Sequence, residues 1–153
     1  MFCITAYGAG MPSDFTLKGM NLVHRGLLAV SFGKIGWDAA GMAVLELTTV
    51  GRKSGESRAV MLTSPLQEGD TIVIVASRGG DDHHPAWYLN LVANPEVQVV
   101  WKGKPKVAMA ARTATADERA RMWPIITEQY KNYAGYQTKT DREIPLVLLT
   151  PTA

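Results

Sequence analysis

Short apolar segments separated by Gly, Pro, Asn and Asp fill most of the chain after residue 41. Segments of this length and composition predict β-strands joined by turns. We expect the first two strands at residues 42–49 and 58–66, paired across a glycine-bracketed turn at 51–55. A third strand at 71–77 contains the apolar run 72–76, which is typical of a core strand.

The second half of the chain continues this pattern. Residues 97–101 and 106–112 predict another hairpin, and residues 144–149 predict a last apolar strand. Pro85 can open a short helix that runs to Ala93, because the fixed φ of proline suits a first helical turn. Six strands, mostly joined by hairpins, and few helices predict a mainly β (α+β) fold built on a small antiparallel barrel.

A further helix is expected after the second hairpin. Thr115 and Glu118 have the spacing of a capping box, which marks a helix start. Pro124 lies inside this helix and should kink it or divide it in two, because proline removes one backbone hydrogen bond.

The N-terminal region is expected to be an accessory to one domain. Residues 14–32 predict an amphipathic helix that packs on the domain; the alternative is that this helix lies on a membrane surface. We expect residues 1–13 to be a flexible extension, since they lack the basic start of a signal peptide. Residues 14–153 are then a single domain.

Composition and charge narrow the classes of function. Hydrophobic residues make up 46% and charged residues 20%, as in an ordinary globular protein, so disorder is not expected. The net charge of +2 is too small for a protein that neutralises nucleic-acid phosphates. Cys3 is the single cysteine, which excludes an internal disulfide and agrees with a reducing cytoplasm. We therefore expect a cytoplasmic monomer or homodimer with a small-molecule partner, and no bound metal.

Cations gather at the turn of the first hairpin. Arg52, Lys53 and Arg58 lie there beside the hydroxyls of Ser54 and Ser57. A tight turn that exposes backbone N–H groups next to cations favours a phosphate or a carboxylate. The alternative is an ordinary solvated hairpin turn.

A second segment follows the third strand. Ser77 and Arg78 emerge where that strand ends, and the next two glycines let a ligand approach the backbone closely. The alternative is a strand terminator with an exposed arginine. His83 and His84 come next, without a carboxylate or cysteine at metal-ligand spacing, so we expect a solvated loop.

A third segment is the helix after Pro85. Trp87 and Tyr88 are adjacent and point in different directions, so one can serve the core and the other a pocket. Asn90 is costly to bury without a partner, and can bond either a backbone loop or a ring carbonyl of a ligand.

These segments, in this order, resemble the deazaflavin-dependent nitroreductase family of actinobacteria. The resemblance covers about residues 44–151 and includes LTTVGRKSG at 47–55, Arg58, ASRGG at 76–80, PAWYLNL at 85–91, ANP at 93–95, TDR at 140–142 and IP at 144–145. It implies a split β-barrel of the FMN-binding, pyridoxamine-oxidase-like kind. It also implies coenzyme F420, an 8-hydroxy-5-deazaflavin whose tail carries a phosphate and a polyglutamate.

The resemblance assigns roles to individual residues. It implies that the coenzyme tail is held by Arg52, Lys53, Ser54 and Arg58. The other implied cofactor-binding residues are Val60, Met61, Leu62, Thr63, Val75, Ala76, Ser77, Arg78, Ala86, Trp87, Tyr88, Leu89 and Asn90. The implied substrate-binding residues are Thr63, Tyr130, Tyr133 and Tyr136. Ser77, Tyr133 and Tyr136 are the catalytic candidates, as proton donors; the three tyrosines could also be one packed helical face.

The implied reaction is hydride transfer from C5 of reduced F420 to a quinone, an enone or a nitro compound. Where the best-known family member has a tyrosine this chain has Thr63, and Ala86 replaces a methionine. Val60 and Met61 stand where that member has Asn-Pro. A roomier and more apolar wall predicts that flat quinones and enones outperform bicyclic nitroimidazoles. An FMN-binding reductase or oxidase on the same barrel, and a non-catalytic F420 carrier or sensor, are the alternatives.

Overall fold

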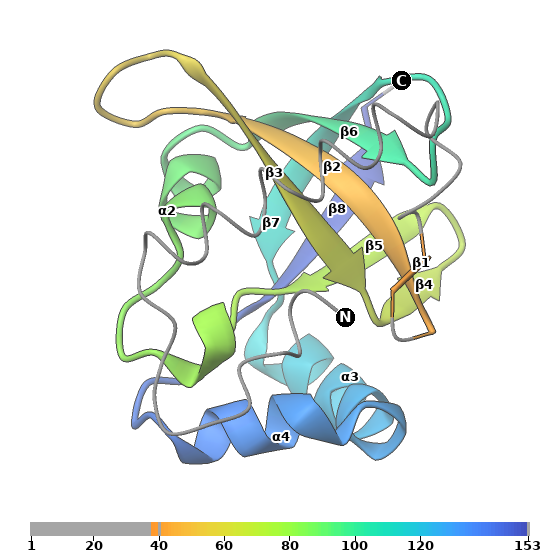
Figure 1. Ribbon diagram of the computed structural model, residues 1–153, viewed down its shortest axis with the longest axis vertical. Helices are drawn as coiled ribbons and strands as arrows, with labels where there is room; N and C mark the ends of the chain where they lie inside the picture. The colour runs from red at the N-terminus through yellow and green to blue at the C-terminus, as the bar shows by residue number, and fades with distance from the viewer. Residues whose placement is uncertain (1–37, 40, 153) are drawn as a thin grey trace.

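An eight-stranded antiparallel sheet rolls into a barrel in the computed structural model, which describes residues 38–39 and 41–152 (Figure 1). Its strands are β1 (Asp38–Ala39), β2 (Met42–Val50), β3 (Ser57–Ser64), β4 (Leu66–Glu68), β5 (Thr71–Val75), β6 (Glu96–Trp101), β7 (Val107–Thr113) and β8 (Leu146–Pro151). The sheet order is β1-β2-β6-β7-β8-β5-β4, and β3 also pairs with β2. β3 contacts β5, which brings the two ends of the sheet together.

The predicted antiparallel barrel is confirmed, and two of its boundaries are set by prolines. The strand expected at 58–66 ends at Ser64, because Pro65 cannot donate to a ladder and Leu66 begins β4. Likewise the last strand begins at Leu146, directly after Pro145, and not at Ile144. The very short β1 and β4 were not expected.

The core consists of two layers that share the strands between them. Along β5, Ile72 and Ile74 point into the barrel, whereas Val73 and Val75 point to the opposite face. That opposite face is covered by α3 (Ala116–Gln129) and α4 (Lys131–Thr138). Because side chains alternate along a strand, an unbroken apolar run is what a strand buried on both faces requires.

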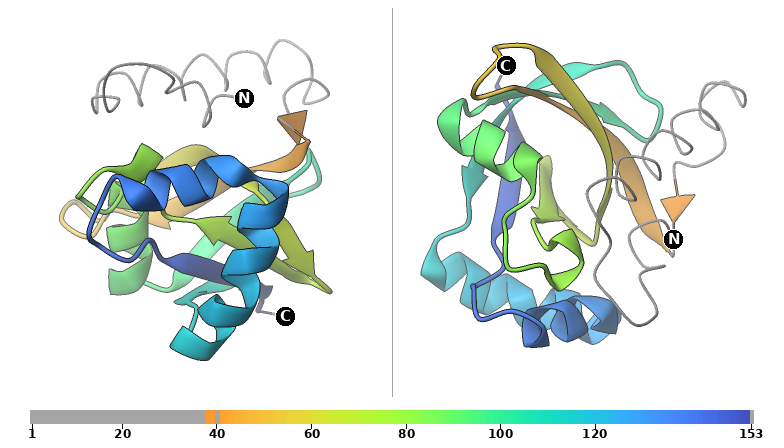
Figure 2. Two further views of the ribbon diagram at one scale, coloured as in Figure 1. Left: turned by 90° about the horizontal axis from the view of Figure 1, so that it is seen from below. Right: turned by 60° about the vertical axis from the view of Figure 1, so that its left-hand side comes forward.

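Helices α3 and α4 lie together at one end of the barrel (Figures 1 and 2). The predicted capping box is present: Thr115 Oγ1 accepts from the backbone N–H of Glu118, and the Glu118 carboxylate accepts from the backbone N–H of Thr115. The helix then continues through Pro124. The division falls at Tyr130, which ends α3 and begins α4, so of the two expected effects of Pro124 the division of the helix is wrong in position.

The remaining helices connect the strands that carry the candidate site. η1 (Arg78–Gly80) is a short 3-10 turn after β5, and α2 (Ala86–Ala93) begins after Pro85 as predicted. None of the helices in the described part of the chain is long and apolar enough to cross a membrane. The expected extension at 1–13, the amphipathic helix at 14–32 and its membrane alternative lie outside the described residues.

Candidate functional site

The turn between β2 and β3 is tight because of Gly51. Its N–H donates to the carbonyl of Glu56 at 2.7 Å, and its carbonyl accepts from Gly55 N–H at 2.8 Å. A Cβ on Gly51 would lie 2.6 Å from Ser54 Oγ and 3.3 Å from the carbonyl oxygen of Glu56, so a side chain there would require Ser54 to move. The turn therefore stays narrow and presents its cations outward.

The side chain of Asn90 in α2 holds this turn in place. The residue is 5% exposed, and its Oδ1 accepts from the backbone N–H of Arg52 at 3.2 Å and from Arg52 Nη1 at 3.0 Å. Its Nδ2 donates to the buried Thr49 hydroxyl at 3.2 Å. The sequence left two partners open for Asn90, a backbone loop or a ring carbonyl of a ligand, and the structure shows the backbone loop. Asn90 thus orients both the backbone and the guanidinium of Arg52.

The other cations and hydroxyls of the turn are exposed. Arg58 forms an ion pair with Glu56 at 3.2 Å, and its side chain is 59% exposed. Ser54 Oγ accepts from the backbone N–H of Glu56 at 3.2 Å. An exposed ion pair of this kind contributes little to stability, so Arg58 can exchange Glu56 for a stronger anion at low cost. Lys53 is exposed as well.

The loop after β5 has an unusual backbone. Val75 and Ala76 are buried, and Ala76 N–H donates to the carbonyl of Pro145 at 3.0 Å. Arg78 then has a φ of +47°, a conformation that non-glycine residues rarely adopt. Its guanidinium lies 3.7 Å from the Asp81 carboxylate. Such strain persists only where the surroundings hold the backbone in place.

Gly80 supplies one such contact. A Cβ at this position would lie 2.6 Å from the carbonyl oxygen of Tyr136 in α4, and Gly80 has a φ of +86°. The loop therefore packs backbone to backbone against α4. From the sequence, the glycine pair was expected to let a ligand approach the backbone, and the packing of Gly80 on α4 was not expected. The glycine pair is the sequence signal from which this close packing could have been predicted.

The expected ring-lining residues of β3 divide between two faces. Val60 and Leu62 are half-buried and pack on the barrel core, together with Trp87 and Tyr88 of α2. Met61 and Thr63 are buried at 4% and 7% exposure, and alternation places them on the opposite face of the strand. Trp87 and Tyr88 are both half-buried and both pack against the barrel core. On the same helix, Ala86 is exposed and Leu89 is half-buried.

The tyrosine cluster lies in the second core layer, which is the layer between the sheet and helices α3 and α4, and there Tyr133 meets Thr63. Tyr133 and Tyr136 are 3% and 6% exposed, and their rings pack edge to face with centroids 6.1 Å apart. The hydroxyls of Tyr133 and Thr63 share a hydrogen bond of 3.3 Å. Tyr130 donates from its hydroxyl to the carbonyl of Gly41 at 3.2 Å. The Thr63–Tyr133 hydrogen bond thus links β3 to α4, and all three tyrosines pack in or against the same core cluster.

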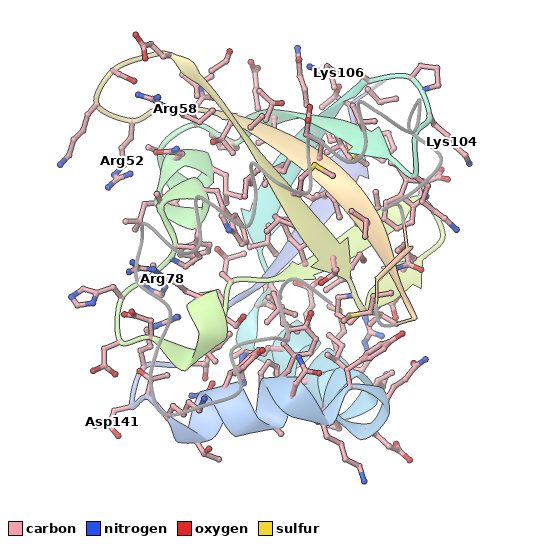
Figure 3. The ribbon with its side chains drawn as sticks, in the orientation of Figure 1. Arg52, Arg58, Arg78, Lys104, Lys106 and Asp141 are labelled. Atoms are coloured by element: carbon pink, nitrogen blue, oxygen red, sulfur yellow. The ribbon has the colours of Figure 1, made fainter. Side chains whose placement is uncertain are left out.

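Figure 3 shows how the cations are distributed. Arg52, Arg58 and Arg78 project along the side that carries α2, whereas Lys104 and Lys106 project at another corner. The loop after β5 is additionally held by the side chain of Arg142, which donates to the carbonyls of Ser77 and Asp81. The sequence had indicated Arg142 only as part of the TDR motif at 140–142. Within the described part of the chain, no group of three or more His, Cys, Asp or Glu side chains could hold a metal ion.

Comparison with known proteins identifies similar chains. Residues 24–151 match the family described as F420H(2)-dependent quinone reductase. An F420H(2)-dependent quinone reductase of Mycobacterium tuberculosis is 37% identical over 132 residues, which cover 84% of this chain and 87% of the relative. A protein of Mycobacterium bovis described as a putative F420H(2)-dependent quinone reductase has the same identity and coverage.

Solved structures agree with the fold. An F420-H2 dependent reductase is 41% identical, with a TM-score of 0.60 over 69% of this chain and 92% of that one. A structure described as a domain-swapped dimer is 35% identical, with a TM-score of 0.62 over 84% of this chain and 96% of that one. A putative pyridoxamine 5'-phosphate oxidase of Listeria innocua is 15% identical with a TM-score of 0.51, covers 86% of this chain and 94% of that one, and supports the fold alone.

Proposed function

Because this chain belongs to the F420H(2)-dependent quinone reductase family, we propose that it reduces a quinone with reduced coenzyme F420 as the hydride donor. The observation that carries the proposal is the β2–β3 turn, in which buried Asn90 aims Arg52 outward among further cations. A set of two guanidiniums and an ammonium around a narrow turn suits a phosphate and carboxylates. The chemistry of this donor set fits the anionic tail of the coenzyme.

Each part of the site has a proposed task. Arg52, Lys53, Ser54 and Arg58 bind the tail. The segment from Val75 to Arg78 and the residues of β3 and α2 named above position the ring. When bound, the coenzyme supplies a hydride, and the protein supplies orientation and a proton.

Orientation is the larger contribution of the protein. Holding two reactants at near-attack geometry can contribute on the order of 7–11 kcal/mol, whereas a proton donor contributes about 10²–10⁴-fold in rate. The quinone gains one hydride and one proton and becomes the quinol. Ser77, Tyr133 and Tyr136 are the proposed proton donors, and Tyr130 and Thr63 complete the proposed substrate wall.

Cofactor titration tests the proposal directly. The protein should quench F420 fluorescence at micromolar or lower concentrations, and FMN should bind more weakly because it lacks the polyglutamate. Steady turnover of menadione with reduced F420 should follow. Tight FMN binding without F420 binding would favour the flavin alternative, and F420 binding without turnover of any quinone, enone or nitro compound would favour a carrier.

Removal of single cations tests the tail site. Arg52→Ala or Lys53→Ala should weaken F420 binding by roughly 1.5–3 kcal/mol per lost charge-assisted hydrogen bond. The loss should shrink as salt is raised, because exposed charges are screened. Lys104→Ala removes an exposed lysine at another corner and is the matched control (Figure 3). Equal affinities of all four proteins at low salt would remove the turn from the site.

Comparison of acceptors tests the substrate class. Small Thr63 and apolar Met61, which share one face of β3, support a preference for flat quinones and enones. Menadione should therefore give a higher kcat/KM than a bicyclic nitroimidazole. The opposite ranking would contradict this assignment.

The assembly and location complete the proposal. The domain-swapped dimer described for a 35% identical relative supports the homodimer among the two states expected from the sequence. Light scattering of the purified protein decides between monomer and dimer. Cys3 as the single cysteine supports a cytoplasmic location.

A further inference from the structure

Arg142 lies between α4 and β8 and binds the backbone of the loop after β5. Its Nε donates to the carbonyl of Asp81 at 2.7 Å, and its Nη2 donates to the carbonyl of Ser77 at 2.9 Å. Nη1 and Nη2 also reach the carbonyl of Ala76 at 3.3 and 3.4 Å. One side chain therefore holds carbonyls at both ends of the loop that carries Arg78.

The shape of the guanidinium makes these contacts compatible. A guanidinium is planar and offers five N–H donors in a fixed fork, whereas a lysine ammonium offers three donors from a single point. A lysine at position 142 would keep the charge but could not reach Ala76, Ser77 and Asp81 together. The loop is held on its other side by Gly80, which packs on the carbonyl of Tyr136.

His84 completes the surroundings of Arg142. Its Nδ1 lies 3.2 Å from Arg142 Nη1, and because a guanidinium can only donate, Nδ1 is the acceptor and the ring is neutral. Burial and the charge of Arg142 lower the pKa of His84 below its ordinary value. Tyr88 packs on the His84 ring at 4.8 Å between centroids.

The remaining charges near this pair are also on the loop. Asp81, Asp82 and Arg78 all act on the Arg142 guanidinium. Asp81 accepts from the backbone N–H and the ring of His83, whose side chain is 83% exposed. Burial opposes ionisation of Asp81, but these hydrogen bonds and Arg78 lower its pKa, so the carboxylate is ionised at neutral pH.

We propose that Arg142 is the positioning residue of the loop from Ser77 to Gly80, and that neutral His84 is its supporting acceptor. The inference rests on the proposed function, in which Ser77 and Arg78 contact the coenzyme. Arg142 touches backbone carbonyls and acts on the coenzyme only through the loop. Protonation of His84 would place two cations side by side and loosen the loop. Because the pKa of His84 lies below the ordinary value of about 6.5, coenzyme affinity should fall only as the pH drops further, through that lowered pKa.

Hydrogen exchange tests the anchor without any coenzyme. The amides of Gly80 and Asp81 donate within the loop, to Ser77 and Arg78, and so report its opening. Arg142→Lys should speed their exchange at least tenfold. Arg119→Lys is the matched control, because Arg119 is also largely buried and donates to the carbonyl of Ile144 without touching the loop. Unchanged exchange in Arg142→Lys, or an equal increase in Arg119→Lys, would overturn the proposal.

Affinity then tests the consequence for the coenzyme. Arg142→Lys should raise the Kd for F420 about tenfold, as expected when hydrogen bonds from a charged group are lost. Arg119→Lys should leave the Kd unchanged even if it lowers the Tm as much as Arg142→Lys does. If wild type binds no F420, the proposed function fails, and the exchange experiment still decides whether Arg142 anchors the loop.

The pH profile tests the role of His84. His84→Asn keeps an acceptor near Arg142 but cannot gain a proton, so its F420 affinity should stay level as the pH falls through the lowered pKa of His84, whereas that of wild type falls. His83→Asn removes the neighbouring exposed histidine and should behave as wild type. A wild-type profile in His84→Asn would overturn the part assigned to His84.

Discussion

Asn90 makes several hydrogen bonds through one short side chain. It is buried, and its side chain joins the β2–β3 turn to α2 and to Thr49. We expect Asn90→Ala to lower the free energy of unfolding by about 1–3 kcal/mol, because it leaves Thr49 and the Arg52 N–H without their partner. Urea unfolding measures the loss. Asn132→Ala is the control: its Nδ2 makes no hydrogen bond and alanine favours helices, so a similar loss there would contradict the assignment.

The hydroxyl of Tyr133 has two competing interpretations. It shares a hydrogen bond with Thr63, and it is also a proposed proton donor. Tyr133→Phe should lower kcat with little change in F420 affinity if the hydroxyl donates the proton. If Tyr133 is only a wall, Phe should be nearly neutral in turnover and Tyr133→Ala should mainly raise KM.

Stability separates the hydrogen bond from the chemistry. Tyr133→Phe alone should destabilise by about 1 kcal/mol, because it removes the Thr63 partner, and Thr63→Val should offset part of that loss in the double mutant. Additive losses in the double-mutant cycle would show that the two hydroxyls do not interact.

At the scale of elements, the loop after β5 and α4 meet through glycine. We expect Gly80→Ala to destabilise by more than about 1 kcal/mol, because both its positive φ and the Tyr136 carbonyl resist a side chain. Gly135→Ala, inside α4 with open space around it, should instead stabilise by about 0.5–1 kcal/mol. Thermal unfolding of the pair measures both signs, and equal shifts in Tm would contradict the packing described.

The elements also show what the sequence could predict. Local signals were sufficient for the hairpins, the α2 start at Pro85 and the capping box at Thr115. The path of α3 through Pro124 was not predictable, because Met122 and Ile126 on both sides of it are buried in the second core layer. Tertiary packing of this kind offsets the one hydrogen bond that proline removes.

Long-range contacts explain the rest of the difference. Asn90 meets Arg52 across 38 residues, and Arg142 meets the loop after β5 across more than 60. No periodicity or turn signal encodes such pairs. Asn90 and Arg142 were therefore visible as members of motifs, whereas the partners of their side chains became visible only in the fold.

For the whole molecule, charge pairs join α3 to the sheet. Arg112 donates to both carboxylate oxygens of Glu118 at 2.7 and 2.8 Å, and Arg121 does the same to Glu68 at 2.7 and 3.0 Å. Hydrogen bonds from Arg112 and from the Thr115 backbone lower the pKa of Glu118 to about 2. A carboxyl with a lowered folded pKa stabilises the protein above its unfolded pKa and loses this as the pH falls.

Stability should therefore drop between about pH 4.5 and pH 2. The contribution of this partly exposed pair is about 1 kcal/mol or less after screening by solvent. Glu118→Gln should show a smaller fall in Tm between pH 5 and pH 2.5 than wild type. Asp117→Asn, in the same helical turn, should keep the wild-type fall, and identical profiles of all three proteins would remove Glu118 as the cause.

The position of β8 has a consequence for biosynthesis. β8 lies between β7 and β5 in the sheet, yet the ribosome makes it after every other described strand. Until β8 emerges, β4 and β5 cannot join the ladder of β2, β6 and β7, and the nascent chain displays two open strand edges. Open edges recruit strands from other chains. A polypeptide that stalls before Leu146 should therefore be a client of chaperones and prone to aggregation, whatever the quality of its coenzyme site.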